Sequence, residues 1–446
     1  MRRHDQRPDV TPPGRWQFGV PYRHWLDNGL QVVVCHRPGQ HVASACLSLD
    51  IPLSAETEQV EGVATIVQRC LDEGTQAHPG PSFAEALEDI GASLEGSVGY
   101  SASQLFLDVP VPRLAEALQL LAEAVRSPEL NSSEVERHCE LRLAEIDQTL
   151  ASSARSAQLA FRRACIPRRF RAARMAAGTK QTVSAITPQA VRDFHTRHYG
   201  PAGATLIITA DVGAGVLAAV QDAFGDWAIT ETPPAVHQIP TRRLPHRWLI
   251  DRPGAVQADI RLGTFAIDRT DPRWADLMVA SHVVGGAFLS RLNKVLREER
   301  GFTYGVHLVS QPMRSGGLLA VQGSFRTEVV AEAVSLAAHL VDVANRPITA
   351  AEVAEAVSFH HGSAPLRYAT AQGVTQHLAA LVAAGLTAEF IDANDLALGQ
   401  VTPLSATETL AELLPPDRLS LVVVGDADGL EQPLTEAGWK PTQHHV

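Results

Sequence analysis

The pattern of apolar and polar positions predicts alternating strands and helices along the 446-residue chain. Apolar residues three or four apart predict a helix at 62–75, with one face directed inward and a polar flank beside it. The inward face consists of Val60, Val63, Ala64, Val67 and Leu71, and the flank of Thr65, Gln68, Arg69 and Asp72. The flank contains no histidine, so it predicts no histidine pair that could bind a metal.

Other segments of the first half follow the same two periodicities. An Asn-Gly turn at 28–29 precedes a β-branched run, and we expect residues 42–50 to form the neighbouring strand. Residues 83–90 predict a short helix and residues 103–110 a strand. Residues 113–126 predict a helix with Leu114, Leu118, Leu121 and Val125 facing inward. This mixture predicts an α+β domain built on a mixed sheet.

The second half repeats the first at a fixed offset. A Thr-Pro helix start, a turn, a short apolar strand and a terminal aspartate occur at 186–211 and again at 401–426. The pairs Thr187 and Thr402, Pro188 and Pro403, Pro201 and Pro416, Leu206 and Leu421, and Asp211 and Asp426 are all 215 positions apart. Five matches at one offset predict two homologous domains of about 215 residues.

A segment rich in proline and polar residues separates the two halves. Residues 227–247 lack a periodic apolar pattern and predict a linker. We therefore expect an N-terminal domain at 1–226 and a C-terminal domain at 248–446, two being the usual number for this length.

Composition narrows the classes of partner and compartment. A net charge of −11 argues against nucleic acid or an anionic membrane as the main partner. The N-terminus has no apolar core after its arginines, and no apolar run is long enough to span a bilayer. Five widely spaced cysteines without a CxxC pair favour reduced, buried thiols. We expect a cytoplasmic protein.

The stretch GVATIVQRCLDEGT at 62–75 resembles the zinc-binding helix of the insulinase/pitrilysin family of inverted zincins. In that family Gly-Val-Ala leads into His-x-x-Glu-His, whose histidines bind zinc and whose glutamate activates water. Here Thr65 and Arg69 replace the histidines and Gln68 replaces the glutamate. Neither His-x-x-Glu-His nor His-Glu-x-x-His occurs anywhere in the chain. The resemblance is to the mitochondrial-processing-peptidase-like bacterial subgroup, and implies two α+β domains facing each other.

One of the three zinc ligands of the family is retained. Glu145 follows Arg69 by 76 positions, the separation the family uses for its third ligand. With two ligands replaced and a guanidinium beside the site, we expect no zinc in this chain. Two hypotheses for Glu145 remain open: it is a solvated helix carboxylate, or it pairs with Arg69, which then stands in for the metal.

The densest resemblance to the family lies in VVGGAFLSRLNKVLREERGFTYGVHL at 283–308. The smaller members carry Gly-Gly-x-Phe-x-Ser-Arg-Leu, then an arginine and a tyrosine seven residues apart that reach the substrate at the zinc. Arg297 and Tyr304 occupy those two positions. An arginine and a phenol can donate hydrogen bonds to a scissile carbonyl as it becomes an oxyanion.

The resemblance implies a division of labour between two chains. We expect a non-zinc-binding subunit of a heterodimeric peptidase, whose partner is a homologous chain with His-x-x-Glu-His and zinc. The substrate would be a peptide or a leader peptide. Glu95 and Gly96 replace the family's Asn-Ala at the strand that binds extended peptides, which puts peptide binding at that edge in question. The alternatives are a catalytically inactive scaffold homologue, and a self-sufficient hydrolase that uses other residues.

Overall fold

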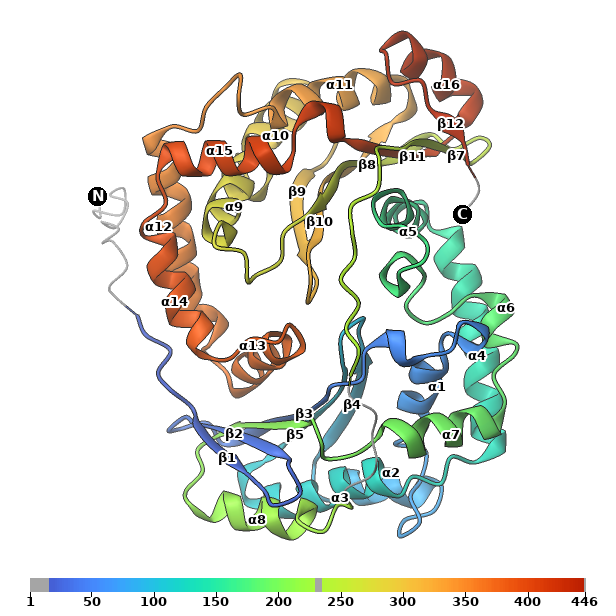
Figure 1. Cartoon of the computed structure of the whole chain (residues 1–446), viewed down its shortest axis with the longest axis vertical. Helices are drawn as coiled ribbons and strands as arrows, with labels where there is room; N and C mark the ends of the chain where they lie inside the picture. The colour runs from blue at the N-terminus through green and yellow to red at the C-terminus, as the bar shows by residue number, and fades with distance from the viewer. Residues whose placement is uncertain (1–15, 229–234, 445–446) are drawn as a thin grey trace, which may run out of the picture.

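A computed structural model describes residues 16–228 and 235–444 and contains two six-stranded sheets that face each other (Figure 1). Both sheets are mixed and carry helices, so the expected α+β fold with two similar domains is confirmed. The proposed division at 226 and 248 remains a prediction. Residues 229–234 of the expected linker, and residues 1–15, lie outside the described residues; residues 235–246 form neither helix nor strand.

The first half supplies six strands and eight α-helices among its described residues. The strands are β1 (Tyr22–Trp25), β2 (Gln31–His36), β3 (Val42–Leu49), β4 (Ser93–Val98), β5 (Ser103–Pro110) and β6 (Thr205–Ala210). The helices are α1 (Val63–Cys70), α2 (Pro81–Asp89), α3 (Leu114–Arg126), α4 (Ser132–Ala151), α5 (Ser153–Cys165), α6 (Lys180–Val183), α7 (Pro188–His198) and α8 (Gly215–Phe224).

The second half repeats most of this order, with two π-helical turns added and with its outer strand at the end of the sequence instead of the beginning. Its strands are β7 (Arg247–Asp251), β8 (Gln257–Ala266), β9 (Val306–Pro312), β10 (Gly317–Arg326), β11 (Ser420–Gly425) and β12 (Thr442–Gln443). Its helices are α9 (Trp274–Ser281), the π-helix η5 (His282–Gly286), α10 (Arg291–Asn293), the π-helix η6 (Lys294–Glu299), α11 (Val330–Val341), α12 (Ala350–Arg367), α13 (Ala371–Ala383), α14 (Glu389–Leu398), α15 (Pro403–Leu413) and α16 (Ala427–Glu436).

The strand order of the first sheet corrects one expectation. The order is β1-β2-β6-β3-β5-β4, so β3 does not neighbour β2. Strand β6 lies between them, parallel to β2 and antiparallel to β3. All six residues of β6 are buried, and a strand of this kind takes a central position because both of its faces are covered. Strand β4 pairs only with β5 and forms an edge.

Equivalent hydrogen bonds occur within each half, at positions 215 residues apart. The carboxylate of Asp211 accepts a bond from the backbone N–H of Gly39 at 2.9 Å, and that of Asp426 accepts one from Gly254 at 3.0 Å. Thr187 and Thr402 both cap the helices that begin at the following proline. The matched sequence positions therefore perform matched structural tasks, as duplication predicts.

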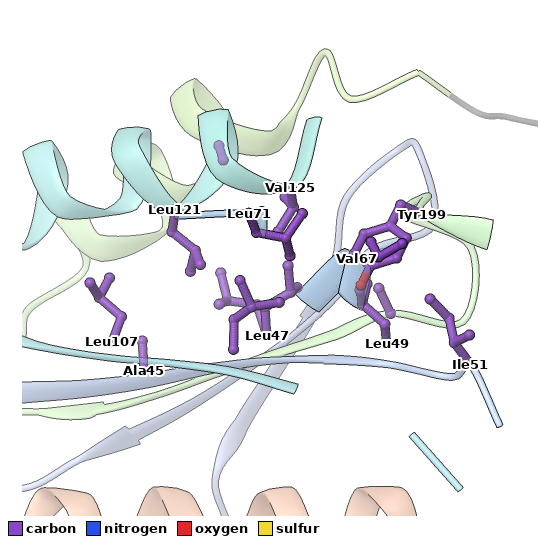
Figure 2. Close-up of a cluster of buried hydrophobic side chains, with 14 of the residues drawn as sticks. Ala45, Leu47, Leu49, Ile51, Val67, Leu71, Leu107, Leu121, Val125 and Tyr199 are labelled. Atoms are coloured by element: carbon purple, nitrogen blue, oxygen red, sulfur yellow. The ribbon is translucent and has the colours of Figure 1, made fainter. Parts of the chain in front are cut away.

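The core of the first half forms between the sheet and the helices that cover one of its faces (Figure 2). Leu47 and Leu49 of β3 meet Val67 of α1 and Leu121 and Val125 of α3, and all five are at least nine-tenths buried. Burial of one such side chain contributes about 1.5–3 kcal/mol. The helix predicted at 113–126 is confirmed as α3, and its predicted inward residues are buried.

One helix of each half packs on the sheet of the other half (Figure 1). Helix α5 covers β8 and β11 of the second sheet, where Phe161 joins a cluster with Trp248 and Val422. Helix α13 covers β3 and β6 of the first sheet, where Leu378 joins a cluster with Ile207. The two halves therefore exchange helices, and each helix completes a core that belongs to both.

Candidate functional site

Helix α1 carries the degenerate motif. Its N-cap is Gly62, whose backbone is in the left-handed region that favours glycine. Gly62 has φ +105°, and a Cβ there would lie 3.0 Å from the carbonyl oxygen of Ala177. The carboxylate of Glu56 accepts hydrogen bonds from the N–H groups of Gly62 at 2.9 Å and Ala64 at 3.1 Å. A carboxylate satisfies the free N–H groups of a first helical turn and complements the helix dipole. The start of α1 is therefore fixed from outside the helix.

The side chains of Arg69 and Glu145 form an ion pair, which confirms the pairing hypothesis. Arg69 Nη2 donates to Glu145 Oε2 at 2.8 Å, and Arg142 Nη1 donates to the same oxygen at 3.1 Å. The hydrogen bond from Arg69 is the main cause that lowers the pKa of Glu145, and Arg142 adds to it. The Arg69 and Glu145 side chains are 30% and 41% exposed, so water screens the pair partially.

Gln68 was expected on the polar flank of α1, but it is buried. Its exposed fraction is 6%, and its Oε1 is buried without a hydrogen-bond partner. The amide lies against Gly96 of edge strand β4, where a Cβ would come within 2.1 Å of Gln68 Nε2. Helical periodicity could not reveal this because β4 covers the flank from another part of the chain. The two departures from the family pattern, Gln68 and Gly96, are therefore sterically linked.

The residues at the three motif positions do not fit zinc. A guanidinium has no acceptor atom, so Arg69 cannot be a ligand. Glu145 already accepts hydrogen bonds from two arginines. Thr65 offers only a neutral hydroxyl, whereas zinc sites in proteins are built from cysteine, histidine and carboxylate groups.

A separate group of potential ligands lies beside the motif. Among the described residues, Glu73, Glu134 and His138 form the one cluster whose ligand atoms approach within 4.8 Å of one another. The Arg137 guanidinium forms ion pairs with both glutamates, and His138 Nε2 lies 2.8 Å from Glu73 Oε1. Arg137 therefore already supplies, at these two carboxylates, the positive charge that a metal ion would bring.

A buried ion-pair network holds the segment that leads into α1, and no sequence pattern predicted it. Arg171 is 2% exposed and donates to Glu56 Oε2 from Nε at 3.1 Å and from Nη2 at 2.8 Å. It also lies 3.4 Å from Glu61, which binds Arg174 at 2.8 Å. Burial raises the pKa of Glu56 despite the opposing effect of Arg171. No local spacing relates residues 56–61 to residues 171–174, so only the folded chain brings them together.

Most of the family-like stretch in the second half has a structural task. Gly285 of η5 lies against β9, where a Cβ would come within 2.2 Å of the Leu308 nitrogen. Ser290 caps the next turn by accepting from Asn293, whose Oδ1 accepts from the N–H of Val306 at 3.0 Å. Arg291 is 6% exposed and donates twice to Glu352 of α12, at 2.8 and 2.7 Å. These residues hold the strand, the turns and α12 together.

Arg297 and Tyr304 differ in their surroundings, and within the described residues no hydrogen bond or ring contact joins them. Tyr304 is 98% exposed and lines an open pocket of about 760 Å³ together with Asp259, Arg261 and His307. Arg297 does not line this pocket. Its guanidinium lies 3.9 Å from the ring centroid of Phe288 and donates to Glu298 at 2.7 Å. The polar residues around Tyr304 were not predicted from the sequence.

Both halves of the chain match known families. The model described as insulinase (peptidase family M16) matches residues 31–164, and the peptidase M16 inactive domain matches residues 185–359. Over 342 residues the chain is 27% identical to an uncharacterized zinc protease of Mycobacterium tuberculosis, which covers 75% of this chain and 77% of that protein. Over 127 residues it is 25% identical to subunit 1 of the human mitochondrial cytochrome b-c1 complex, which covers 28% of this chain and 26% of that protein.

The fold has a solved counterpart. The crystal structure of a peptidase M16 inactive domain from Pseudomonas fluorescens is similar with a TM-score of 0.83 and 21% identity, and the match covers 91% of this chain and 98% of that one. The matched segments, the paired six-stranded sheets and the altered motif in α1 all indicate the same family. The chain belongs to the insulinase (M16) family of peptidases, as a member without the His-x-x-Glu-His motif.

Proposed function

We propose that this chain is the non-zinc-binding subunit of a heterodimeric insulinase-type peptidase. The observation that carries the proposal is the contrast within residues 283–308. Gly285, Arg291 and Asn293 serve the fold through close packing or buried hydrogen bonds, whereas Tyr304 is 98% exposed. A side chain that contacts so little of its own chain is free to contact another molecule. In α1, meanwhile, Thr65 and Arg69 stand at the positions of the two zinc-binding histidines, and Arg69 pairs with Glu145 of α4.

The proposed task of Arg297 and Tyr304 is to bind the substrate and stabilise the oxyanion at the zinc site of the partner. The guanidinium and the phenol can both donate hydrogen bonds. Loss of one such donor typically costs about 3–4 kcal/mol, a hundredfold to thousandfold fall in turnover. For this, Arg297 must exchange its contacts with Glu298 and Phe288 for the substrate.

The partner would be a homologous subunit with an intact His-x-x-Glu-His, and the substrate a peptide or a leader peptide. None of the helices within the described residues is long and apolar enough to cross a bilayer. All five cysteines are free, as expected, and four are buried, which suits a reducing compartment; we therefore propose a cytoplasmic location.

The test is cleavage of a quenched-fluorescence peptide by the chain reconstituted with such a partner. Tyr304→Phe and Arg297→Ala should each lower turnover about a hundredfold or more without changing co-elution of the pair. Tyr22→Phe, at another exposed tyrosine, and Arg300→Ala, three residues along from Arg297, serve as matched controls. Wild-type turnover in both test variants would contradict the proposal. Chelator-insensitive cleavage by the chain alone would instead favour a self-sufficient hydrolase.

A second candidate function is a catalytically inactive scaffold. The similarity to a cytochrome b-c1 subunit favours it, as does the engagement of Arg297 with Glu298 and Phe288. Under this alternative, an assembled complex would form normally, but the two variants would leave every measured activity unchanged.

A further inference from the structure

A second pocket lies away from α1 and Tyr304, where the C-terminal helices meet the N-terminal segment. It has a volume of about 150 Å³ and is lined by Trp16 and by residues of α9, α12, α13 and α14. Figure 1 shows α12 and α14 running along one side of the molecule, with the start of the described chain beside α14. This pocket shares no lining residue with the pocket around Tyr304.

Stacked aromatic rings form one wall of the pocket. The rings of Trp16 and Tyr368 are parallel within 2° at a centroid distance of 4.8 Å. His377 of α13 meets Tyr368 edge-on at 5.4 Å. Trp274 of α9 and Phe390 of α14 add further apolar surface. A flat apolar group is the ligand that such a wall accommodates.

Two arginines line the same pocket without a carboxylate partner among the described residues. The Arg269 guanidinium lies 5.9 Å from the Trp274 ring and makes no side-chain hydrogen bond or ion pair with any residue in 16–228 or 235–444. Arg367 contacts the Tyr368 phenol. Burial lowers the pKa of Arg269, and the like charge of Arg367 lowers it further. Arg269 is half-buried, whereas Arg367 lies at the exposed mouth of the pocket. A half-buried guanidinium normally has an anion beside it, because an unpaired buried charge is costly.

The positive charge of the two arginines also affects a histidine of the pocket. Burial lowers the pKa of His377 to about 4, and Arg367 and Arg269 contribute to the shift. His360 Nε2 is buried without a hydrogen-bond partner. The pocket has one acidic lining residue, Asp395, which lies 3.6 Å from His361. The remaining ionisable groups that line it therefore carry positive charge or none.

We propose that this pocket binds a small organic carboxylate with a flat apolar body, the carboxylate meeting Arg269 and Arg367 and the body lying against the aromatic wall. An arginine can hold a carboxylate through two parallel hydrogen bonds. A cavity of about 150 Å³ is large enough for a benzene ring. The proposal does not depend on the peptidase role, since it uses none of the residues assigned to that role.

The experiment measures binding of benzoate to the full chain by isothermal titration calorimetry and by thermal unfolding. Benzoate should raise the melting temperature in a concentration-dependent way, because a ligand of the native state stabilises it. Benzyl alcohol, acetate and inorganic phosphate are the comparison probes, since each lacks either the charge, the ring or the planar carboxylate. The Cε1 resonance of His377 should move with benzoate, which locates the binding.

Arg269→Gln and Arg367→Gln should each weaken benzoate binding about tenfold or more. Arg269→Gln should also leave the ligand-free melting temperature equal or higher, because it removes an unpaired, half-buried charge. Arg242→Gln removes an exposed arginine outside the pocket and should change neither quantity. Four results would overturn the proposal: no response to benzoate, an equal response to benzyl alcohol, a response to phosphate alone, or unaltered affinity in both pocket variants.

Discussion

Replacing Arg171 with methionine should be among the most destabilising single changes in the N-terminal half. Arg171 is 2% exposed. Its guanidinium donates to Glu56 Oε2 at 3.1 and 2.8 Å, to the Met175 carbonyl at 3.0 Å and to the Ala176 carbonyl at 2.7 Å. Methionine fills similar space but leaves Glu56, whose side chain is fully buried, without its cation. Removing one partner of a buried pair costs about 3–5 kcal/mol. The total free energy of unfolding of a natural domain is about 5–15 kcal/mol, so this loss is a large part of it.

The deficit should depend on pH in a defined direction. Burial raises the pKa of Glu56, so the folded protein binds a proton more readily than the unfolded chain, whose glutamates titrate near about 4.3. The contribution of Glu56 to stability is therefore full below that pH and declines as the pH rises through its folded pKa. Arg171 opposes the rise in the pKa of Glu56, so Arg171→Met should raise that pKa further. Glu56 of the variant should then be protonated over a wider range of pH. The deficit of the variant should be smaller at pH 5 than at pH 8.

Urea unfolding followed by tryptophan fluorescence at both pH values measures the effect. Arg168→Met is the matched control, because it removes an exposed arginine three residues away. Adding Glu56→Gln to Arg171→Met should restore about 1–2 kcal/mol, since the amide oxygen can still accept from Gly62 and Ala64 while the buried charge is gone. A deficit within about 1 kcal/mol of the control, or one that grows toward pH 5, would refute the reasoning.

Three further predictions test the site and its surroundings. A double-mutant cycle of Arg69→Ala and Glu145→Ala should give a coupling of about 0.5–1 kcal/mol at pH 7, because both side chains are partly exposed; zero coupling would contradict the pairing. Since the pKa of Glu145 is lowered, its contribution exists above about pH 4.3 and should disappear as the pH falls through its folded pKa. Gly285→Ala should cost about 1–3 kcal/mol in urea unfolding, because its Cβ would meet the Leu308 nitrogen, whereas Gly213→Ala, in open space, should be near neutral; equal effects would argue against the packing role. Elemental analysis after incubation with zinc and dialysis should find far less than one equivalent, and stoichiometric zinc held inside the chain would overturn the account of α1.

Local periodicity predicted those elements whose environment is decided by their own neighbours. The strand predicted at 103–110 is β5, and the helix predicted at 113–126 begins only one residue later as α3. The Arg69 and Glu145 pair could also be anticipated, because the family spacing of 76 positions relates two distant helices.

Features that depend on contacts between distant segments escaped prediction. The insertion of β6 between β2 and β3 arises from pairing between distant parts of the chain. The burial of Gln68 depends on Gly96 of β4, and the Glu56 and Arg171 pair depends on a turn more than a hundred residues away. A helix pattern identifies faces, but it does not say which strand or loop covers a polar flank.

The exchange of α5 and α13 between the sheets has a consequence for how the chain holds together. Phe161 is buried among residues of the C-terminal sheet, and Leu378 among those of the N-terminal sheet. Proteolytic nicking of the connector at 235–246 should therefore leave two fragments that stay bound to each other. Neither fragment alone could keep its sheet covered, so each would expose an apolar surface that invites aggregation. The covalent link between the halves matters for bringing them together during synthesis, and much less for keeping them together afterwards.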